Sequence, residues 1–153
     1  MSNNLLTATA SIQVLKPVAE VFEMIQNPQK GMVNFWINKS SGPFTEGAML
    51  QWGFPEFDEQ FPVRVGKVID DELITFYWEA ENGKEHEVKM AFADYKGSTV
   101  VTITESGEPN TPEGLKWAIG NTEGWANFCA CLKAWAEHGI NLRKGAFDYR
   151  FEG

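Results

Sequence analysis

The spacing of apolar residues constrains this chain most, because it changes from two to about 3.6 near residue 110. Before that point, five segments alternate apolar and polar residues as half-buried strands do, at 47–54, 61–69, 73–80, 85–94 and 98–106. Short joins such as Glu81-Asn82-Gly83 and Tyr95-Lys96-Gly97 predict antiparallel hairpins between them. Residues 7–14 alternate in the same way, so we expect an antiparallel sheet of about six strands.

The last third of the chain has the spacing of a long helix. Asn110 or Thr111 is a typical N-cap, and the following proline suits a first helical position. Gly120-Asn121 predicts an interruption, after which Thr122 caps a fresh start that ends at Gly139. The apolar face of this second part spans about 120° of the helix surface and comprises Trp125, Phe128, Cys129, Leu132, Trp135 and Ala136.

Two short helices are expected between the first strand and the others. Pro17 opens the first, and Asn27-Pro28 ends it and starts a second that leads to Phe35-Trp36. The order strand, two helices, five strands and long helix predicts an α+β domain. Since one face of the sheet must be buried, the C-terminal helix is expected to cover it. No repeat or linker divides residues 1–153, so we expect a single domain.

Composition excludes several functions. Thirteen basic and 21 acidic residues give a net charge of −8, which disfavours binding to nucleic acid or to an anionic membrane surface. No signal peptide, membrane anchor or spanning segment is recognisable, and Cys129 and Cys131 cannot form a disulfide scaffold, so we expect a cytoplasmic protein. Walker, GxGxxG and GxSxG motifs are absent from the sequence, and two histidines make a structural metal site improbable. We therefore expect no cofactor and no metal.

Several short motifs resemble one protein family. They are Lys16-Pro17-Val18, Ser41-Gly42-Pro43, Thr104-Glu105-Ser106-Gly107, Thr122-Glu123-Gly124-Trp125 and, most strongly, residues 132–142. With the order of elements, they make residues 6–142 similar to the START/Bet v 1-like (SRPBCC) superfamily and, within it, to the activator of Hsp90 ATPase homologue 1-like family. The resemblance implies a helix-grip fold, in which a curved antiparallel sheet wraps around the long C-terminal helix. It also implies a chaperone as a possible partner.

Strand alternation places aromatic and polar side chains on one face of the sheet. His86 shares the parity of Met90, and Glu105 shares that of Ile103, so both polar side chains should point toward the helix. If the strands pair in chain order, the concave face and the helix present nine candidate ligand-binding residues: Trp52, Phe76, Trp78, His86, Met90, Glu105, Trp125, Phe128 and Trp135. Six tryptophans and eleven phenylalanines fit an aromatic-lined pocket, although the same side chains could form a packed core.

Two of these candidates can titrate. A buried histidine is commonly a satisfied core residue, and a carboxylate on an apolar face is costly unless it is paired. Glu105 also stands at a predicted strand end, where exposure or capping of the predicted loop 107–113 would explain it. Our hypothesis is that His86 and Glu105 orient a polar group of an otherwise apolar ligand.

The preferred function is therefore binding of a small apolar or amphipathic molecule between the sheet and the C-terminal helix. One alternative is a protein-interaction module related to the Hsp90 co-chaperone, using Phe54, Phe57 and Phe61 beside the acidic loop residues 56–59 to dock a basic partner. Another is a cyclase-like or hydrolase-like enzyme that uses His86 or Glu105 in the same cavity. Exposed aromatic residues and an open sheet edge make a homodimer conceivable.

Overall fold

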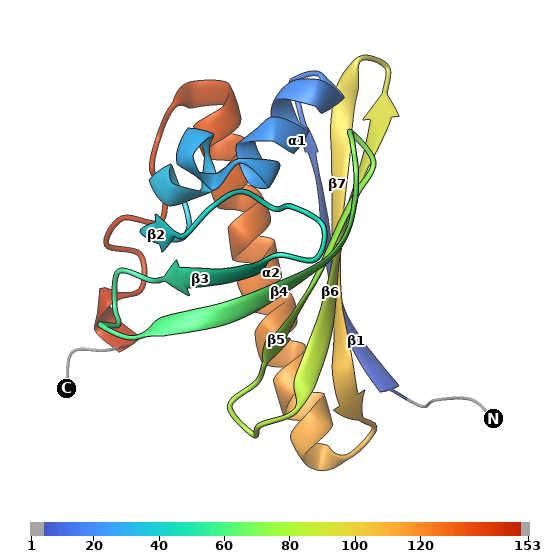
Figure 1. The fold of residues 1–153 in the computed structure, drawn as a ribbon, viewed down its shortest axis with the longest axis vertical. Helices are drawn as coiled ribbons and strands as arrows, with labels where there is room; N and C mark the ends of the chain where they lie inside the picture. The colour runs from blue at the N-terminus through green and yellow to red at the C-terminus, as the bar shows by residue number, and fades with distance from the viewer. Residues whose placement is uncertain (1–4, 151–153) are drawn as a thin grey trace.

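The computed structural model describes residues 5–150, and its strands form one antiparallel sheet in the order β1-β7-β6-β5-β4-β3-β2 (Figure 1). The seven strands are β1 (Leu5–Val14), β2 (Lys39–Ser40), β3 (Met49–Gly53), β4 (Gln60–Ile69), β5 (Leu73–Glu79), β6 (Glu85–Tyr95) and β7 (Ser98–Pro109). Strands β2 to β7 pair in chain order through short connections, whereas β1 adds to the outer edge of β7. Pairing in chain order is as the sequence predicts.

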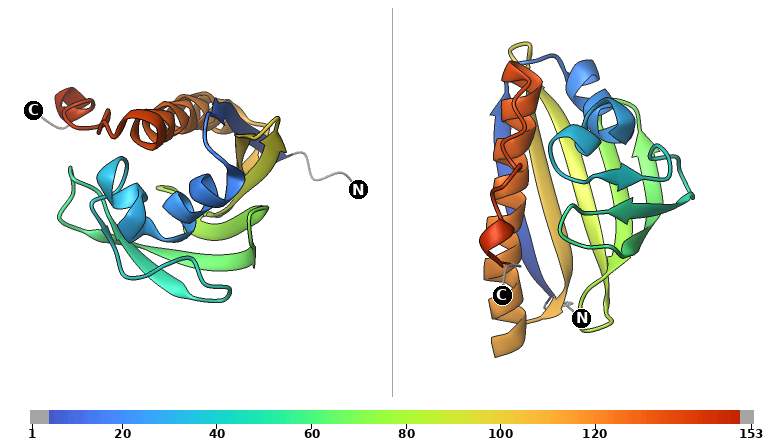
Figure 2. Two further views of the ribbon diagram at one scale, coloured as in Figure 1. Left: turned by 90° about the horizontal axis from the view of Figure 1, so that it is seen from above. Right: turned by 90° about the vertical axis from the view of Figure 1, so that its left-hand side faces the viewer.

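The helices lie on one side of this sheet. They are α1 (Val18–Gln26), α2 (Pro112–His138) and three 3₁₀ turns, η1 (Pro28–Lys30), η2 (Met32–Asn34) and η3 (Asp148–Arg150). Seen from above, the sheet curls into an open trough with α1 and the first two turns inside it (Figure 2). Helix α2 runs along the open side and packs chiefly against β1. This arrangement is the expected helix-grip fold.

Helix α2 corrects one prediction, because it continues through Gly120-Asn121 without a break. Thr122, the predicted new cap, instead donates its hydroxyl to the Ala118 carbonyl at 2.6 Å, one turn earlier. A helical glycine costs only about 1 kcal/mol, which burial of the apolar face can offset. Both predicted ends are confirmed: the Thr111 side chain accepts from the Gly114 amide, and Gly139 has φ of 66°.

The strand count also differs from the prediction of about six. The additional strand is β2, which has only two residues and pairs with the end of β3. So short a segment leaves no alternation in the sequence to detect. The other strands begin and end within one or two residues of the predicted bounds, except that β7 extends to Pro109 through part of the predicted loop 107–113.

The core lies between the concave face of the sheet, α1 and α2. From the helices, Phe22, Ile25, Phe128 and Leu132 are buried in it. Opposite them, the strands contribute alternate buried residues, as in β6, where His86, Val88, Met90 and Phe92 all face inward. None of the helices formed by residues 5–150 is long and apolar enough to cross a membrane.

Candidate functional site

An irregularity near the end of β7 creates the most unusual feature of the interior. Glu105 and Glu108 are an odd number of residues apart, so a regular strand would turn them to opposite faces. The pairing of β7 with β1 skips Gly107, which has φ of 150° and forms a β-bulge. Because the bulge resets the alternation, both carboxylates point inward, where they are 1% and 3% exposed.

The two carboxylates enclose His86, which is completely buried on β6. Its Nδ1 lies 2.7 Å from Glu105 Oε2, and its Nε2 lies 2.5 Å from Glu108 Oε2. A neutral imidazole has one N–H donor, so only the imidazolium form can donate to both carboxylates at once. Gly107 is also required for this approach, since a Cβ there would lie 2.3 Å from His86 Cδ2.

Glu105 joins the sheet to α2. Besides His86, its oxygens accept hydrogen bonds from Trp78 Nε1 at 3.0 Å, Asn121 Nδ2 at 2.9 Å and Trp125 Nε1 at 2.8 Å. Four donors on two oxygens approach the number that a carboxylate can accept. Glu105 is therefore fully engaged by protein groups.

Glu108 faces the end of the β5–β6 hairpin. Asn82 Nδ2 lies 3.0 Å from both of its oxygens, and Lys84 Nζ lies 3.6 Å away. Burial alone would raise the pKa of Glu108, but the hydrogen bonds from His86 and Asn82 and the charge of Lys84 outweigh it and hold this pKa below its usual value. The Trp117 ring meets the His86 ring nearly at right angles, at 4.7 Å between centroids. We call Glu105, His86 and Glu108 the His86 cluster.

The predicted inward direction of His86 and Glu105 is confirmed and the two side chains are in contact, whereas Glu108 was missed. Sequence reasoning placed Glu108 in a loop, because Gly107 and Pro109 read as strand-breaking residues. A glycine inside a strand is also the usual sign of a bulge, and that signal could have identified the second carboxylate.

Five of the other predicted residues form an aromatic layer beside the His86 cluster. Their ring centroids are 5.4 Å apart for Trp52–Phe76, 5.3 Å for Phe76–Trp78, 5.9 Å for Trp78–Trp125 and 5.5 Å for Trp125–Phe128. These separations are those of rings in direct contact. Met90 is buried further along β6, and Trp135 is half-buried near the end of α2.

Trp52 is the exception within this layer. Its side chain is almost completely buried, yet its Nε1–H has no acceptor among the described residues. Buried indole N–H groups usually find a partner, and leaving one without an acceptor costs about 1–3 kcal/mol. Trp78 and Trp125, by contrast, both donate to Glu105.

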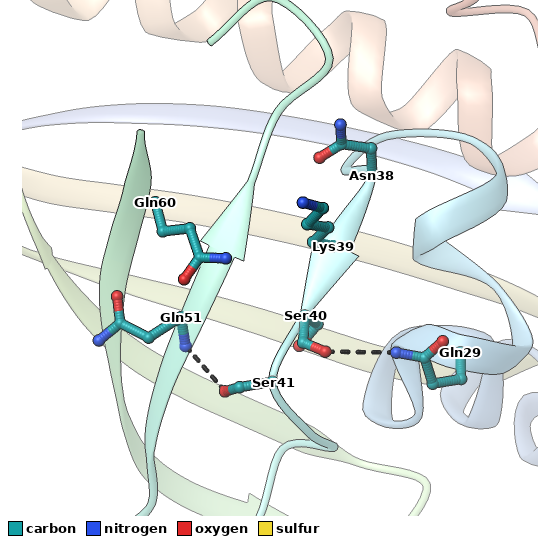
Figure 3. Close-up of a pocket in the computed structure, with 7 residues that line it drawn as sticks. All are labelled: Gln29, Asn38, Lys39, Ser40, Ser41, Gln51 and Gln60. Carbon is teal, nitrogen blue, oxygen red and sulfur yellow. Dashed lines mark hydrogen bonds between the residues drawn. The ribbon is translucent and has the colours of Figure 1, made fainter. Parts of the chain in front are cut away.

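Two pockets lie outside the nine predicted residues. The first, of about 310 Å³, is polar and lies where β2 and β3 approach η1 (Figure 3). Gln29 Nε2 donates to the Ser40 carbonyl, and the backbone N–H of Gln51 donates to Ser41 Oγ. These hydrogen bonds use some of the polar groups that line the pocket. The complete lining is Gln29, Asn38, Lys39, Ser40, Ser41, Gln51 and Gln60.

The second pocket, of about 320 Å³, has an apolar wall and a charged wall. The apolar wall comes from η2 and the loops around it, through Val33, Phe35, Trp36, Ile37 and Pro55. The remaining wall contains Asn38 and Glu56 and, from the segment after α2, Asn141, Arg143, Lys144, Gly145 and Asp148. We call it the Arg143 pocket. The acidic loop residues 56–59 are recognisable in the sequence, but no local pattern connects Glu56 with Arg143.

The Arg143 pocket adjoins the aromatic layer. Phe35 and Trp36, which line it, contact Phe128 at centroid distances of 5.6 Å and 5.3 Å. Phe128 belongs to the layer through its contact with Trp125. The pocket and the layer therefore share a wall of rings.

The curved antiparallel sheet closed by a long C-terminal helix defines a helix-grip domain of the START/Bet v 1-like class. Within that class, the chain belongs to the family described as "Activator of Hsp90 ATPase homolog 1-like protein", whose model matches residues 16–137. Both conclusions agree with the resemblance seen in the sequence. Among curated proteins, none matches this chain.

Solved structures share this fold. The protein SSP2350 from Staphylococcus saprophyticus is 30% identical, with a TM-score of 0.79 over 90% of this chain and 96% of that one. The Aha1 dimer from Colwellia psychrerythraea is 17% identical, with a TM-score of 0.71 over 88% and 98%. DynU16, from the dynemicin biosynthetic locus, is 22% identical, with a TM-score of 0.77 over 92% of this chain but 49% of its own. The last two likenesses establish the fold alone.

Proposed function

We propose that this chain binds a small apolar or amphipathic molecule between its sheet and α2, entering through the Arg143 pocket. The observation that carries the proposal is the buried Nε1–H of Trp52, which has no acceptor among residues 5–150. It lies in an aromatic layer, the lining that small-molecule sites commonly have. An oxygen of a bound molecule would give this donor the acceptor that the protein does not supply.

The position of the Arg143 pocket supports the route. The aromatic side chains of the layer contact one another, so a ligand has to enter where space already exists and move the rings that border it. Phe35 and Trp36 form that border, because they line the pocket and contact Phe128. The aromatic layer, which contains five of the nine residues predicted from the sequence, is then the inner part of the site.

The proposal is tested by thermal unfolding of the full chain with a library of lipids and small metabolites. A ligand present at 100 times its dissociation constant should add about 2.7 kcal/mol to the free energy of unfolding. For any molecule that stabilises the protein, Trp52→Phe should weaken binding about threefold to tenfold, the effect of losing one hydrogen bond. Tyr95→Phe is the control, since Tyr95 is exposed at the end of β6, outside the nine residues and the linings of both pockets. If no library member raises the melting temperature, the proposal is wrong.

A docking function related to the family's co-chaperone is the second candidate. Asp58 and Glu59 are exposed in the β3–β4 loop beside Phe57, which is 43% exposed. Glu56 cannot share this role, because both of its oxygens accept hydrogen bonds from Arg143. Calorimetric titration with Hsp90 tests the candidate: Asp58→Lys with Glu59→Lys should abolish the heat of binding, whereas Asp70→Lys with Asp71→Lys, in the exposed β4–β5 turn, should leave it unchanged.

The enzyme alternative receives less support. His86 and Glu105 are enclosed, and their polar atoms are bonded to each other and to other side chains. A general acid or base has to come within hydrogen-bond reach of its substrate.

A further inference from the structure

Arg143 is an unusually enclosed cation for a residue beyond the last long helix. Its Nη1 and Nη2 donate to the two oxygens of Glu56 at 2.9 Å and 2.8 Å, and both side chains are 91% buried. The guanidinium carbon lies 4.9 Å from the Trp36 ring centroid, 5.4 Å from that of Phe147 and 5.7 Å from that of Phe54. The ion pair and the rings fix the guanidinium beside the pocket.

One donor of this fixed group is unused. Arg143 Nε is buried and has no acceptor within the described part of the chain. The bidentate pair with Glu56 sets the direction of the whole guanidinium plane, so Nε cannot turn to find a partner without breaking that pair. A fixed donor with no acceptor, on a residue that lines a pocket, is suited to an oxygen of a bound molecule once it is uncovered.

The charges around the pocket decide whether a charged or a neutral oxygen of a ligand pairs best with Nε. Arg143 and Lys144 balance Glu56 and Asp148 in its lining. Since Glu56 already neutralises Arg143 and the whole chain carries a net charge of −8, a carboxylate ligand would gain no net attraction. A neutral carbonyl oxygen can accept from Nε at a smaller desolvation cost. The ring-lined wall favours a planar, apolar body for the rest of the ligand.

We propose that the Arg143 pocket recognises a neutral aromatic carbonyl compound, whose carbonyl oxygen accepts from Arg143 Nε while its ring lies against Phe35 and Trp36. The inference rests on the proposed function and adds to it the chemical class of the ligand. Because Nε is covered in this structure, binding includes a shift of a neighbouring side chain. In this proposal the side chain that shifts is Phe147, which lies against the guanidinium on the segment after α2.

Three probes of matched shape test the inference: 2-acetylnaphthalene, 2-ethylnaphthalene and 2-naphthoate, titrated into the full chain and followed by tryptophan fluorescence. The ketone should bind about tenfold more tightly than the ethyl compound, the effect of one hydrogen bond to a charged donor. It should also bind more tightly than the carboxylate. Arg143→Lys keeps the charge opposite Glu56 but removes Nε, so it should erase the preference for the ketone. Arg64→Lys, on β4 and outside the pocket lining, should leave it intact.

The outcomes separate this inference from the proposed function. Equal binding of the ketone and the ethyl compound, or a preference that survives Arg143→Lys, would overturn the role of Nε. Tighter binding of 2-naphthoate would overturn the neutral class. If none of the three binds while other library members stabilise the protein, only this inference fails. If no member of the library binds either, the proposed function fails with it.

Discussion

The His86 cluster and the Arg143 pocket are two places where charged side chains are buried, and they differ in how fully their donors are used. Glu105 accepts hydrogen bonds from four groups, and both nitrogens of His86 face a carboxylate oxygen. Arg143 also has a carboxylate partner, but its Nε has no acceptor in the part of the chain described. Both sites are therefore buried, but only in the His86 cluster are these polar groups all hydrogen-bonded.

This difference separates a structural role from a binding role. Satisfied buried charges hold elements in register, because removing one partner leaves the others unpaired. The His86 cluster links β5, β6, β7 and α2 in this way. A fixed donor that has no acceptor contributes nothing to that network, and it can pair with an added molecule whose binding uncovers it.

The largest effect is expected from Glu105→Gln. The amide nitrogen brings donors to a place where four donors already converge, so at least one buried N–H loses its acceptor. We expect a loss of about 3–5 kcal/mol in the free energy of unfolding, measured by urea denaturation. Glu85→Gln is the control, because its surface pair with Arg64 should be worth no more than about 1 kcal/mol. Equal losses for the two variants would contradict a structural role for the cluster.

Gly107→Ala should have the next largest effect. A Cβ at this position would lie 2.3 Å from His86 Cδ2, and φ of 150° is a conformation that alanine rarely adopts. We expect a loss of about 2–4 kcal/mol in unfolding free energy, from strain and displacement of the imidazole together. Gly97→Ala isolates the backbone contribution, since φ there is 86° with open space around the Cβ, and it should cost about 1 kcal/mol. A similar cost at both positions would show that the His86 side chain can move away from the added Cβ with little loss of stability.

A matched pair of tryptophans compares a used donor with an unused one. Trp125 and Trp52 are both buried, but only Trp125 Nε1 has an acceptor, Glu105 at 2.8 Å. Trp125→Phe should therefore lower the unfolding free energy by about 1.5–3 kcal/mol more than Trp52→Phe, the value of a hydrogen bond to a charged group. Chemical denaturation of both variants measures this difference. A larger loss for Trp52→Phe would mean that its indole N–H is satisfied in solution.

The sequence predicts the framework well because periodic burial leaves a periodic pattern. Five of the seven strands lie within one or two residues of their predicted bounds, and the inward direction of His86 and Glu105 follows from parity alone. The sequence also predicts both ends of α2, because Thr111 can cap its first turn and Gly139 can adopt the left-handed conformation that ends it.

The departures arise where a local signal has more than one meaning. Gly107 read as the start of a loop but forms a bulge inside β7, and Gly120 read as a break but lies within a continuous helix. The ion pair of Glu56 with Arg143 joins residues 87 positions apart, so no local pattern could reveal it. Tertiary packing decides all three, and packing is not encoded in a short window of sequence.

The smallest expected effect concerns the response of the His86 cluster to acid. Because its hydrogen bonds and the charge of Lys84 hold the pKa of Glu108 below the usual value of 4.5 despite burial, the folded protein binds fewer protons there than the unfolded chain. This stabilisation is present above 4.5 and is lost as the pH falls through the lower folded-state value. Glu108→Gln cannot titrate, so its unfolding free energy should decline less steeply than that of the wild type between about pH 5 and pH 3.

Glu137 provides a parallel case for this acid response. Burial opposes ionisation there too, but the Leu15 amide and Lys133 lower the pKa of Glu137, so Glu137→Gln should also flatten the decline. Urea denaturation of both variants across this pH range gives the two slopes. Since the two carboxyl groups share no hydrogen-bond partner among residues 5–150, the double variant should show the sum of the two changes. A wild-type slope in Glu108→Gln would mean that the carboxyl group at 108 holds its proton equally in both states, and that its hydrogen bonds and Lys84 do not lower its pKa in the folded protein.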